Sequence, residues 1–231
     1  MHTSVENMAA YARMRERLSA VLADVDDTTA AATPVPACPG WSVADLTAHV
    51  YGVARDVTDG NVADAGTDPW TAFQVERFAP LGVAAMVEEW NTIAPGFEEA
   101  LSGFPEEITA RIVFDSGTHE HDLRGALDRP GARDADTVVI GLEFMAGGLD
   151  GLAAREGLPG LELVTPEVTS TIGGGPVRVR LATDTFSLYR ALAGRRSVPQ
   201  ILALPWEGDA TPYLTVFDGA PMRPPVADLV E

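Results

Sequence analysis

The chain has 231 residues, of which 46% are hydrophobic and 22% charged, so it is large and apolar enough to bury a core. Its net charge of −18, from 16 basic and 34 acidic side chains, argues against partners such as nucleic acid or an anionic membrane. There is no long apolar run and no basic, apolar N-terminus, so we expect neither a transmembrane helix nor a signal peptide. Cys38 is the single cysteine, which excludes an intramolecular disulfide and fits a cytoplasmic protein.

Apolar residues at helical spacing dominate the first two thirds of the chain. The pattern predicts a first helix over about residues 4–27. A second helix should begin at the N-cap Ser42, because Asp45 follows three residues later as in a capping box. A long packed loop is expected over residues 59–81, with a short helix inside it as an alternative. Three more helices are predicted, over residues 82–101, 105–127 and 135–155.

The pattern changes after about residue 158. Residues 176–182, PVRVRLA, alternate with period two and predict a strand. Short helices should follow the N-caps Asp184 and Ser197, and residues 212–217, PYLTVF, are expected to form a last strand. The sequence therefore predicts a mainly α fold in two domains, a helical bundle over residues 1–158 and a small α/β domain over residues 159–231.

The candidate chemistry lies on two of the predicted helices. Six residues of the fourth helix follow one another in steps of four and three, which places them on one seam: Ile108, Ile112, Asp115, His119, Asp122 and Ala126. Ionisable groups on a core-facing seam are costly to bury without a partner, and a metal ion would serve all of them. His49, beside the apolar stripe of the second helix, would supply a third ligand next to Asp115 and His119. Two histidines and a carboxylate leave positions open, as in a catalytic metal site.

Other interpretations of these residues stay open. A buried His–Asp hydrogen-bond network without a metal would also satisfy the seam, and Asp122 could orient the second ring nitrogen of His119. His121 lies off the seam, so we expect it at the surface or behind the ligands. Cys38 has no histidine near it in the sequence and is interpreted as a small buried hydrophobic residue, rather than as a nucleophile.

Three stretches resemble one known family. Residues 38–50, CPGWSVADLTAHV, and 114–127, FDSGTHEHDLRGAL, are similar to the signature stretches of the mycothiol-dependent maleylpyruvate isomerase-like proteins of actinobacteria. Residues 184–209 resemble the C-terminal domain of the same group. These proteins belong to the wider DinB-like superfamily, so the resemblance implies a DinB-like metal-binding four-helix bundle followed by a small α/β C-terminal domain.

The resemblance also implies a ligand set. It assigns a divalent metal, typically zinc, to His49, Asp115 and His119, with Asp115 standing where the isomerase has a glutamate. Ligand type favours zinc and also admits nickel, iron or manganese.

The isomerase uses an arginine of its C-terminal domain in the active site. The matching region of this chain contains Arg190, Arg195 and Arg196. From these we predict Arg195 and Arg196, together with Asp122, as catalytic residues.

The function implied is that of a metal- and thiol-dependent enzyme. A low-molecular-weight thiol such as mycothiol, bound as thiolate, would add to a small electrophilic substrate, and the outcome would be isomerisation or S-transfer. We expect a cytoplasmic monomer or homodimer with no nucleic-acid or membrane partner. The alternatives are a non-catalytic metal- or small-ligand-binding protein of the DinB-like fold and an interaction module without metal.

Overall fold

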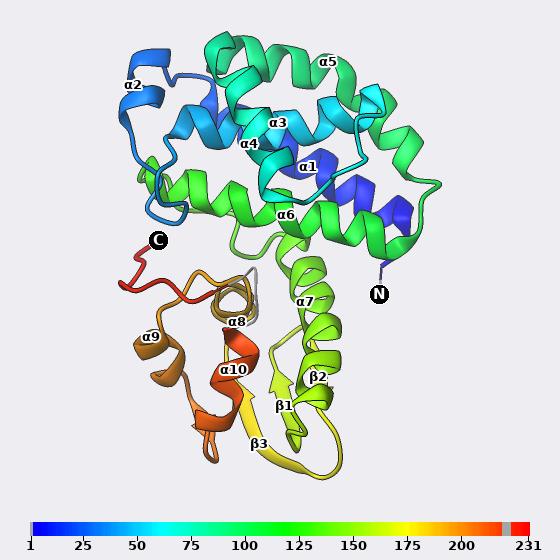
Figure 1. Ribbon diagram of the computed structural model, residues 1–231, viewed down its shortest axis with the longest axis vertical. Helices are drawn as coiled ribbons and strands as arrows, with labels where there is room; N and C mark the ends of the chain where they lie inside the picture. Colours follow the sequence, from blue (N-terminus) through cyan, green and yellow to red (C-terminus); the bar gives the residue numbers. More distant parts are fainter. Residues whose placement is uncertain (1, 219–222) are drawn as a thin grey trace. The chain divides into compact units, whose positions relative to one another are not determined.

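The computed structural model describes residues 2–218 and 223–231, which form two compact units (Figure 1). One unit comprises His2–Gly131 with Glu231, and the other comprises Ala132–Val230. Within the described ranges there are ten α-helices and one four-stranded sheet, and all four strands belong to the second unit. The predicted fold class, mainly α with a small α/β C-terminal part, is confirmed.

Four long helices build the first unit. They are α1 (Ser4–Leu22), α3 (Val43–Asp59), α5 (Val83–Leu101) and α6 (Glu106–Ala126). Helices α1 and α3 each pack against both α5 and α6, which closes the four into a bundle (Figure 1). Its core includes Trp90, whose indole N–H donates to the hydroxyl of the buried Tyr11 at 2.9 Å. The expected capping box starts α3, since Ser42 and Asp45 exchange backbone-to-side-chain hydrogen bonds of 2.8 and 3.2 Å.

Two shorter helices complete this unit. The first long helix ends at Leu22, and a separate helix α2 (Asp27–Ala32) begins because Asp26 accepts the N–H of Thr29 at 2.9 Å. The predicted loop over residues 59–81 contains α4 (Asp68–Phe78), which is capped by Thr67 and packs against α3.

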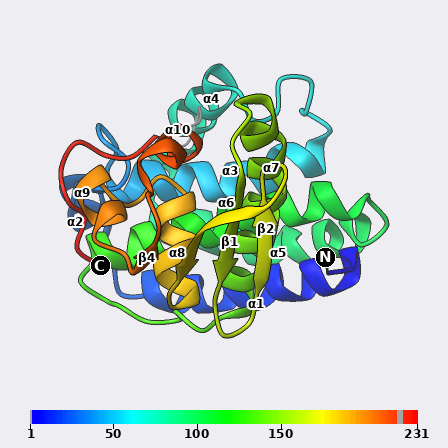
Figure 2. The same ribbon diagram turned by 90° about the horizontal axis from the view of Figure 1, so that it is seen from below.

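The second unit is a helix on a mixed sheet. Helix α7 (Asp136–Arg155) packs against strand β2 and helix α8 (Thr185–Leu192). The strands are β1 (Gly160–Val164), β2 (Thr169–Ile172), β3 (Val177–Ala182) and β4 (Trp206–Glu207), in the order β2-β1-β3-β4 (Figure 2). β1 and β3 are parallel, and both outer pairings are antiparallel. The expected strand at 176–182 and the helices after Asp184 and Ser197, α8 and α9 (Val198–Leu202), are present.

The last predicted strand is wrong. Residues 212–217 form a 3-10 turn (Thr211–Tyr213) and the short helix α10 (Leu214–Phe217). Pro212 sits in the first turn, where its missing N–H costs nothing. The buried residues are Tyr213, Val216 and Phe217, which is helical spacing, and the place beside β3 is taken by β4.

Helix α7 belongs to the second unit. We expected the boundary near residue 158, whereas the compact units divide between Gly131 and Ala132. The apolar stripe of α7 resembles that of a bundle helix, but it buries against α8, and Gly141 leaves room for the ring of Tyr189. Within residues 2–218 and 223–231, α7 is the one helix long and apolar enough to cross a membrane. Of that stretch, 44% is buried inside the protein, and a single helix of this kind is weak evidence for a membrane span.

Candidate metal centre

The three predicted ligands meet between α3 and α6. His49 Nε2 lies 3.6 Å from Asp115 Oδ2, and His119 Nε2 lies 3.7 Å from Asp115 Oδ1. The two imidazole rings are 5.1 Å apart and nearly perpendicular, and all three donor atoms lie within 4.8 Å of one another. Bonds of about 2.0–2.1 Å to a tetrahedral ion would separate such donors by about 3.3 Å. A small contraction of the trio would therefore bring it to ligand distance.

The orientation of His49 is fixed through helix α4. Its Nδ1 lies 2.8 Å from Gln74 Oε1, and Gln74 Nε2 donates to Asp56 Oδ2 at 2.8 Å. A carboxylate can only accept, so the amide must turn its NH₂ group to Asp56 and its oxygen to His49. Nδ1 of His49 therefore carries a hydrogen, and Nε2 is the ring nitrogen that faces Asp115. A buried acceptor for the N–H of the far ring nitrogen is typical of metal-binding histidines.

The far end of this chain of bonds is also anchored. Asp56, which is fully buried, is paired with Arg77 and accepts from Asn61 Nδ2 at 3.1 Å. Gly52, one turn after His49, lets α4 approach, because a Cβ there would lie 2.8 Å from the Cβ of Gln74. The side chain of Gln74 is thereby fixed by its hydrogen bond to Asp56 and by the close packing of α4 against α3 at Gly52.

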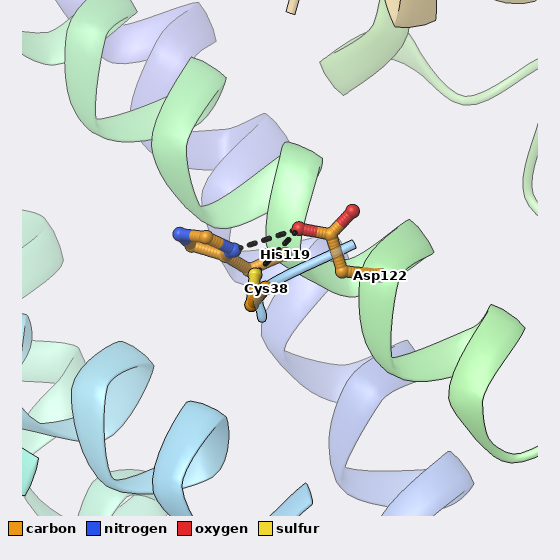
Figure 3. A group of neighbouring side chains, drawn as sticks. All are labelled: Cys38, His119 and Asp122. Atoms are coloured by element: carbon orange, nitrogen blue, oxygen red, sulfur yellow. Dashed lines mark hydrogen bonds and ion pairs between the residues drawn. The ribbon is translucent and has the colours of Figure 1, made fainter. Parts of the chain in front are cut away.

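His119 is oriented by a residue of its own helix. Its Nδ1 donates to Asp122 Oδ2 at 3.0 Å, as the spacing suggested, and this leaves Nε2 directed at Asp115. The thiol of Cys38 donates to the same carboxylate oxygen at 3.5 Å (Figure 3). Cys38 is half-buried, and His121 is buried within the helical unit.

The charge at the centre favours a cation. Burial lowers the pKa of His49, but the hydrogen bond and negative charge of Asp115, together with Gln74, outweigh it, so that the pKa lies above its ordinary value. Asp115 is the most exposed of the three ligands, with 36% of its side chain accessible, whereas His49 and His119 are buried. An ion or small molecule would thus meet solvent at the Asp115 side.

The comparisons agree with this arrangement. Residues 11–119 match the family model of the mycothiol maleylpyruvate isomerase N-terminal domain, a range that includes His49, Asp115 and His119. This part of the chain, from α1 to α6, is therefore similar to that family. The resemblance inferred from the sequence is therefore confirmed. No curated protein matches the chain.

Two solved structures share the fold. Both are crystal structures of the mycothiol-dependent maleylpyruvate isomerase, one of them a histidine-to-alanine mutant. Their TM-scores to this chain are 0.57 for the mutant and 0.56 for the other, with 15% and 16% sequence identity. Each comparison covers 84% of this chain and 92% of the isomerase. At this identity the likeness establishes a common fold rather than a common substrate.

The remaining predicted residues have different placements. Arg195 and Arg196 lie in the turn after α8, in the second unit, where their guanidinium groups donate to the carbonyls of Ala193 and Arg195 at 3.1 and 2.7 Å. Their catalytic role stays a prediction. The seam of α6 holds at Asp115, His119 and Asp122 but not at its start, because Ile108 is exposed.

Sequence reasoning missed Gln74 and Asp56. Asp56 gave a signal, since it lies seven residues after His49 and so on the same face of the second helix. Gln74 gave none, because nothing in a stretch read as a loop indicates which polar side chain turns inward.

Proposed function

We propose that this protein is a metal-dependent enzyme that uses a low-molecular-weight thiol of the mycothiol type to isomerise or conjugate a small electrophilic substrate. The observation that carries the proposal is that Nε2 of His49 and Nε2 of His119 both face the carboxylate of Asp115, while Nδ1 of each ring is paired elsewhere. Two histidines and one carboxylate leave at least one position open for another ligand. Zinc fits this nitrogen and oxygen set best, while nickel, iron and manganese are compatible with it.

The protein's own groups would divide the work. His49, Asp115 and His119 would hold the ion, while Gln74 and Asp122 keep each ring nitrogen Nδ1 protonated and each ring in place. A bound divalent ion would lower the pKa of a coordinated thiol and so supply a thiolate at neutral pH. The exposed side of Asp115 is where the thiol and substrate would enter.

The second unit would contribute substrate binding. We propose that Arg195 or Arg196 holds a carboxylate of the substrate, since a guanidinium group binds a carboxylate through two parallel hydrogen bonds. The fully buried Arg190 is a less suitable candidate, because its side chain is not accessible. The protein is proposed to act in the cytoplasm, where a low-molecular-weight thiol stays reduced.

Elemental analysis of the untagged protein tests the proposal. We expect about one equivalent of metal in the wild type, and none in His49→Ala or His119→Ala. His2→Ala is the matched control, because this histidine lies at the N-terminus and should leave the metal content unchanged. Thiol-dependent turnover of electrophilic acids should depend on the same two histidines.

Two outcomes would contradict the proposal. A wild-type protein that takes up no metal after incubation with zinc would indicate a buried His–Asp hydrogen-bond network. Metal binding without thiol-dependent turnover would indicate the alternative, a non-catalytic metal- or ligand-binding protein.

A further inference from the structure

A second group of donor atoms lies behind His119. Asp122 Oδ2 is 3.5 Å from Cys38 Sγ and 3.0 Å from His119 Nδ1, and the three donor atoms lie within 4.8 Å of one another (Figure 3). Cys38 belongs to the turn before α3, and the other two residues belong to α6. All three lie in the helical unit. This group uses the opposite ring nitrogen of His119 from the one that faces Asp115.

The spacing of these atoms suits a tetrahedral ion. Bonds of about 2.3 Å to sulfur and about 2.0–2.2 Å to oxygen or nitrogen place sulfur and oxygen about 3.5 Å apart, and nitrogen and oxygen about 3.3 Å apart. The observed separations of 3.5 and 3.0 Å are close to both values. His119 and Asp122 are buried, and Cys38 is half-buried, so an ion would be partly sheltered from water but still reachable.

The backbone keeps the thiol in place. The N–H of Cys38 donates to the carbonyl of Val35 at 3.0 Å, and the carbonyl of Cys38 accepts from Trp41 at 3.0 Å. Pro34 and Ser42 form a β-bridge that closes the same turn. These bonds fix the backbone at Cys38, and its thiol is held by the hydrogen bond to Asp122, so the donor loses little freedom when it binds an ion.

We propose that Cys38, Asp122 and Nδ1 of His119 form a second metal site, for thiophilic divalent ions such as Cd²⁺. A thiolate, an imidazole and a carboxylate make a softer set than His49, Asp115 and His119, so the two sets differ in the ions they favour. On binding, a sulfur–metal bond forms and the thiol proton is released to solvent. The hydrogen on Nδ1 of His119 moves to Nε2, so the imidazole stays neutral.

The two sets compete for one histidine. A neutral imidazole has a single lone pair, on Nε2 when it serves with His49 and on Nδ1 when it serves with Cys38. A thiophilic ion beside Cys38 therefore removes His119 from the first set, a consequence that rests on the proposed function. Such ions would inhibit the enzyme by redirecting a ligand, without entering the open position between the histidines.

A cadmium titration of the full-length protein tests the site. The ultraviolet thiolate-to-cadmium charge-transfer band should saturate at about one Cd²⁺ per chain in the wild type and in His49→Ala, which lacks a ligand of the first set only. The band should be absent in Cys38→Ser. The affinity read from it should fall at least about tenfold in His119→Ala and in Asp122→Ala, since each lacks one of three donors. Far-ultraviolet circular dichroism checks that each variant is folded.

Two results would overturn the second site. No charge-transfer band in the wild type would show that Cys38 is not a ligand. An unchanged cadmium affinity in both His119→Ala and Asp122→Ala would show that the thiol binds cadmium by itself. If one of these variants fails to fold, the other decides, because each removes a different donor.

A cobalt-loaded protein tests the competition. One equivalent of Cd²⁺ should change the visible spectrum of bound Co²⁺ in the wild type, and leave it unchanged in Cys38→Ser. Equal change in both would mean that cadmium enters the first set directly, which would overturn the competition. If the wild type binds no cobalt, the proposed function fails, while the charge-transfer band in His49→Ala still decides the second site.

Discussion

The two histidines of the candidate centre are held in different ways. His119 is oriented by Asp122, a carboxylate three residues later in the same helix. His49 is oriented by Gln74, a neutral amide 25 residues away on α4, which is itself fixed by Asp56. One ligand thus depends on the geometry of a single helix, and the other depends on α4 packing against α3. The centre should be more sensitive to changes on the His49 side.

Loss of the amide should have the largest effect. Gln74→Met keeps the size of the side chain but removes the acceptor for His49 Nδ1–H and the donor to Asp56. Loss of such a partner typically costs about 10–100-fold in metal affinity, and we expect zinc affinity, measured against a chromophoric chelator, to fall in this range. Gln200→Met, which removes the hydrogen bond from the Ser197 N–H to the Gln200 side chain at the start of α9, should leave the affinity unchanged. A wild-type affinity in Gln74→Met would show that the α4 contact does not position His49.

The matching change on the His119 side should have a smaller effect on zinc affinity. Asp122→Asn keeps a carbonyl oxygen that can accept the hydrogen of His119 Nδ1, so we expect zinc affinity to fall by no more than about tenfold. The same chelator competition measures it. A larger loss than in Gln74→Met would reverse the comparison, and would mean that the negative charge of Asp122 matters more than the position of either ring.

Pushing α3 and α4 apart should destabilise the protein and lower its zinc affinity by a few-fold. In Gly52→Ala, the new Cβ would lie 2.8 Å from the Cβ of Gln74, so α4 must shift. Overpacking of this kind costs about 1–3 kcal/mol, which thermal unfolding would detect. Gly96→Ala in α5 is the control, because a Cβ there meets no atom within 4 Å, and helix propensity predicts a gain of up to about 1 kcal/mol. Equal behaviour of the two variants would contradict the close approach at Gly52.

A clash in the other unit should leave the metal affinity unaltered. In Gly141→Ala, the added Cβ would lie 2.5 Å from the ring of Tyr189, which disturbs the packing of α7 on α8. We expect a loss of about 1–3 kcal/mol in stability with unchanged zinc affinity. Gly147→Ala in the same helix has open space around the new Cβ and should not be destabilised. Weaker zinc binding in Gly141→Ala would show that α7 supports the centre.

His119 is oriented within its own helix and His49 by a separate one. The same difference explains which site residues could be predicted from the sequence. Asp115, His119 and Asp122 lie on one helix, so their spacing alone indicated that they share a face. Gln74 could not be found this way, because its role depends on how a separate helix packs. The error at 212–217 has another cause. A run of six apolar and polar residues fits both the helical period and the strand period, so packing decides which of the two forms.

The domain boundary was missed for a related reason. The apolar stripe of α7 shows that the helix is buried, but a stripe does not identify the surface that covers it. Its partner, α8, comes after three strands in the sequence, and no local pattern links the two. The bundle itself was predictable, since several long amphipathic segments have few other ways to bury their faces.

The order of these residues along the chain also bears on how the protein is made. Every donor of both groups lies between Cys38 and Asp122, and the helical unit is complete at Gly131 apart from Glu231. At about 5–20 residues per second, the ribosome needs roughly 3–10 s more to reach the end of β3 at Ala182. A nascent chain can therefore complete its bundle, with every donor of both proposed sites, before its sheet exists.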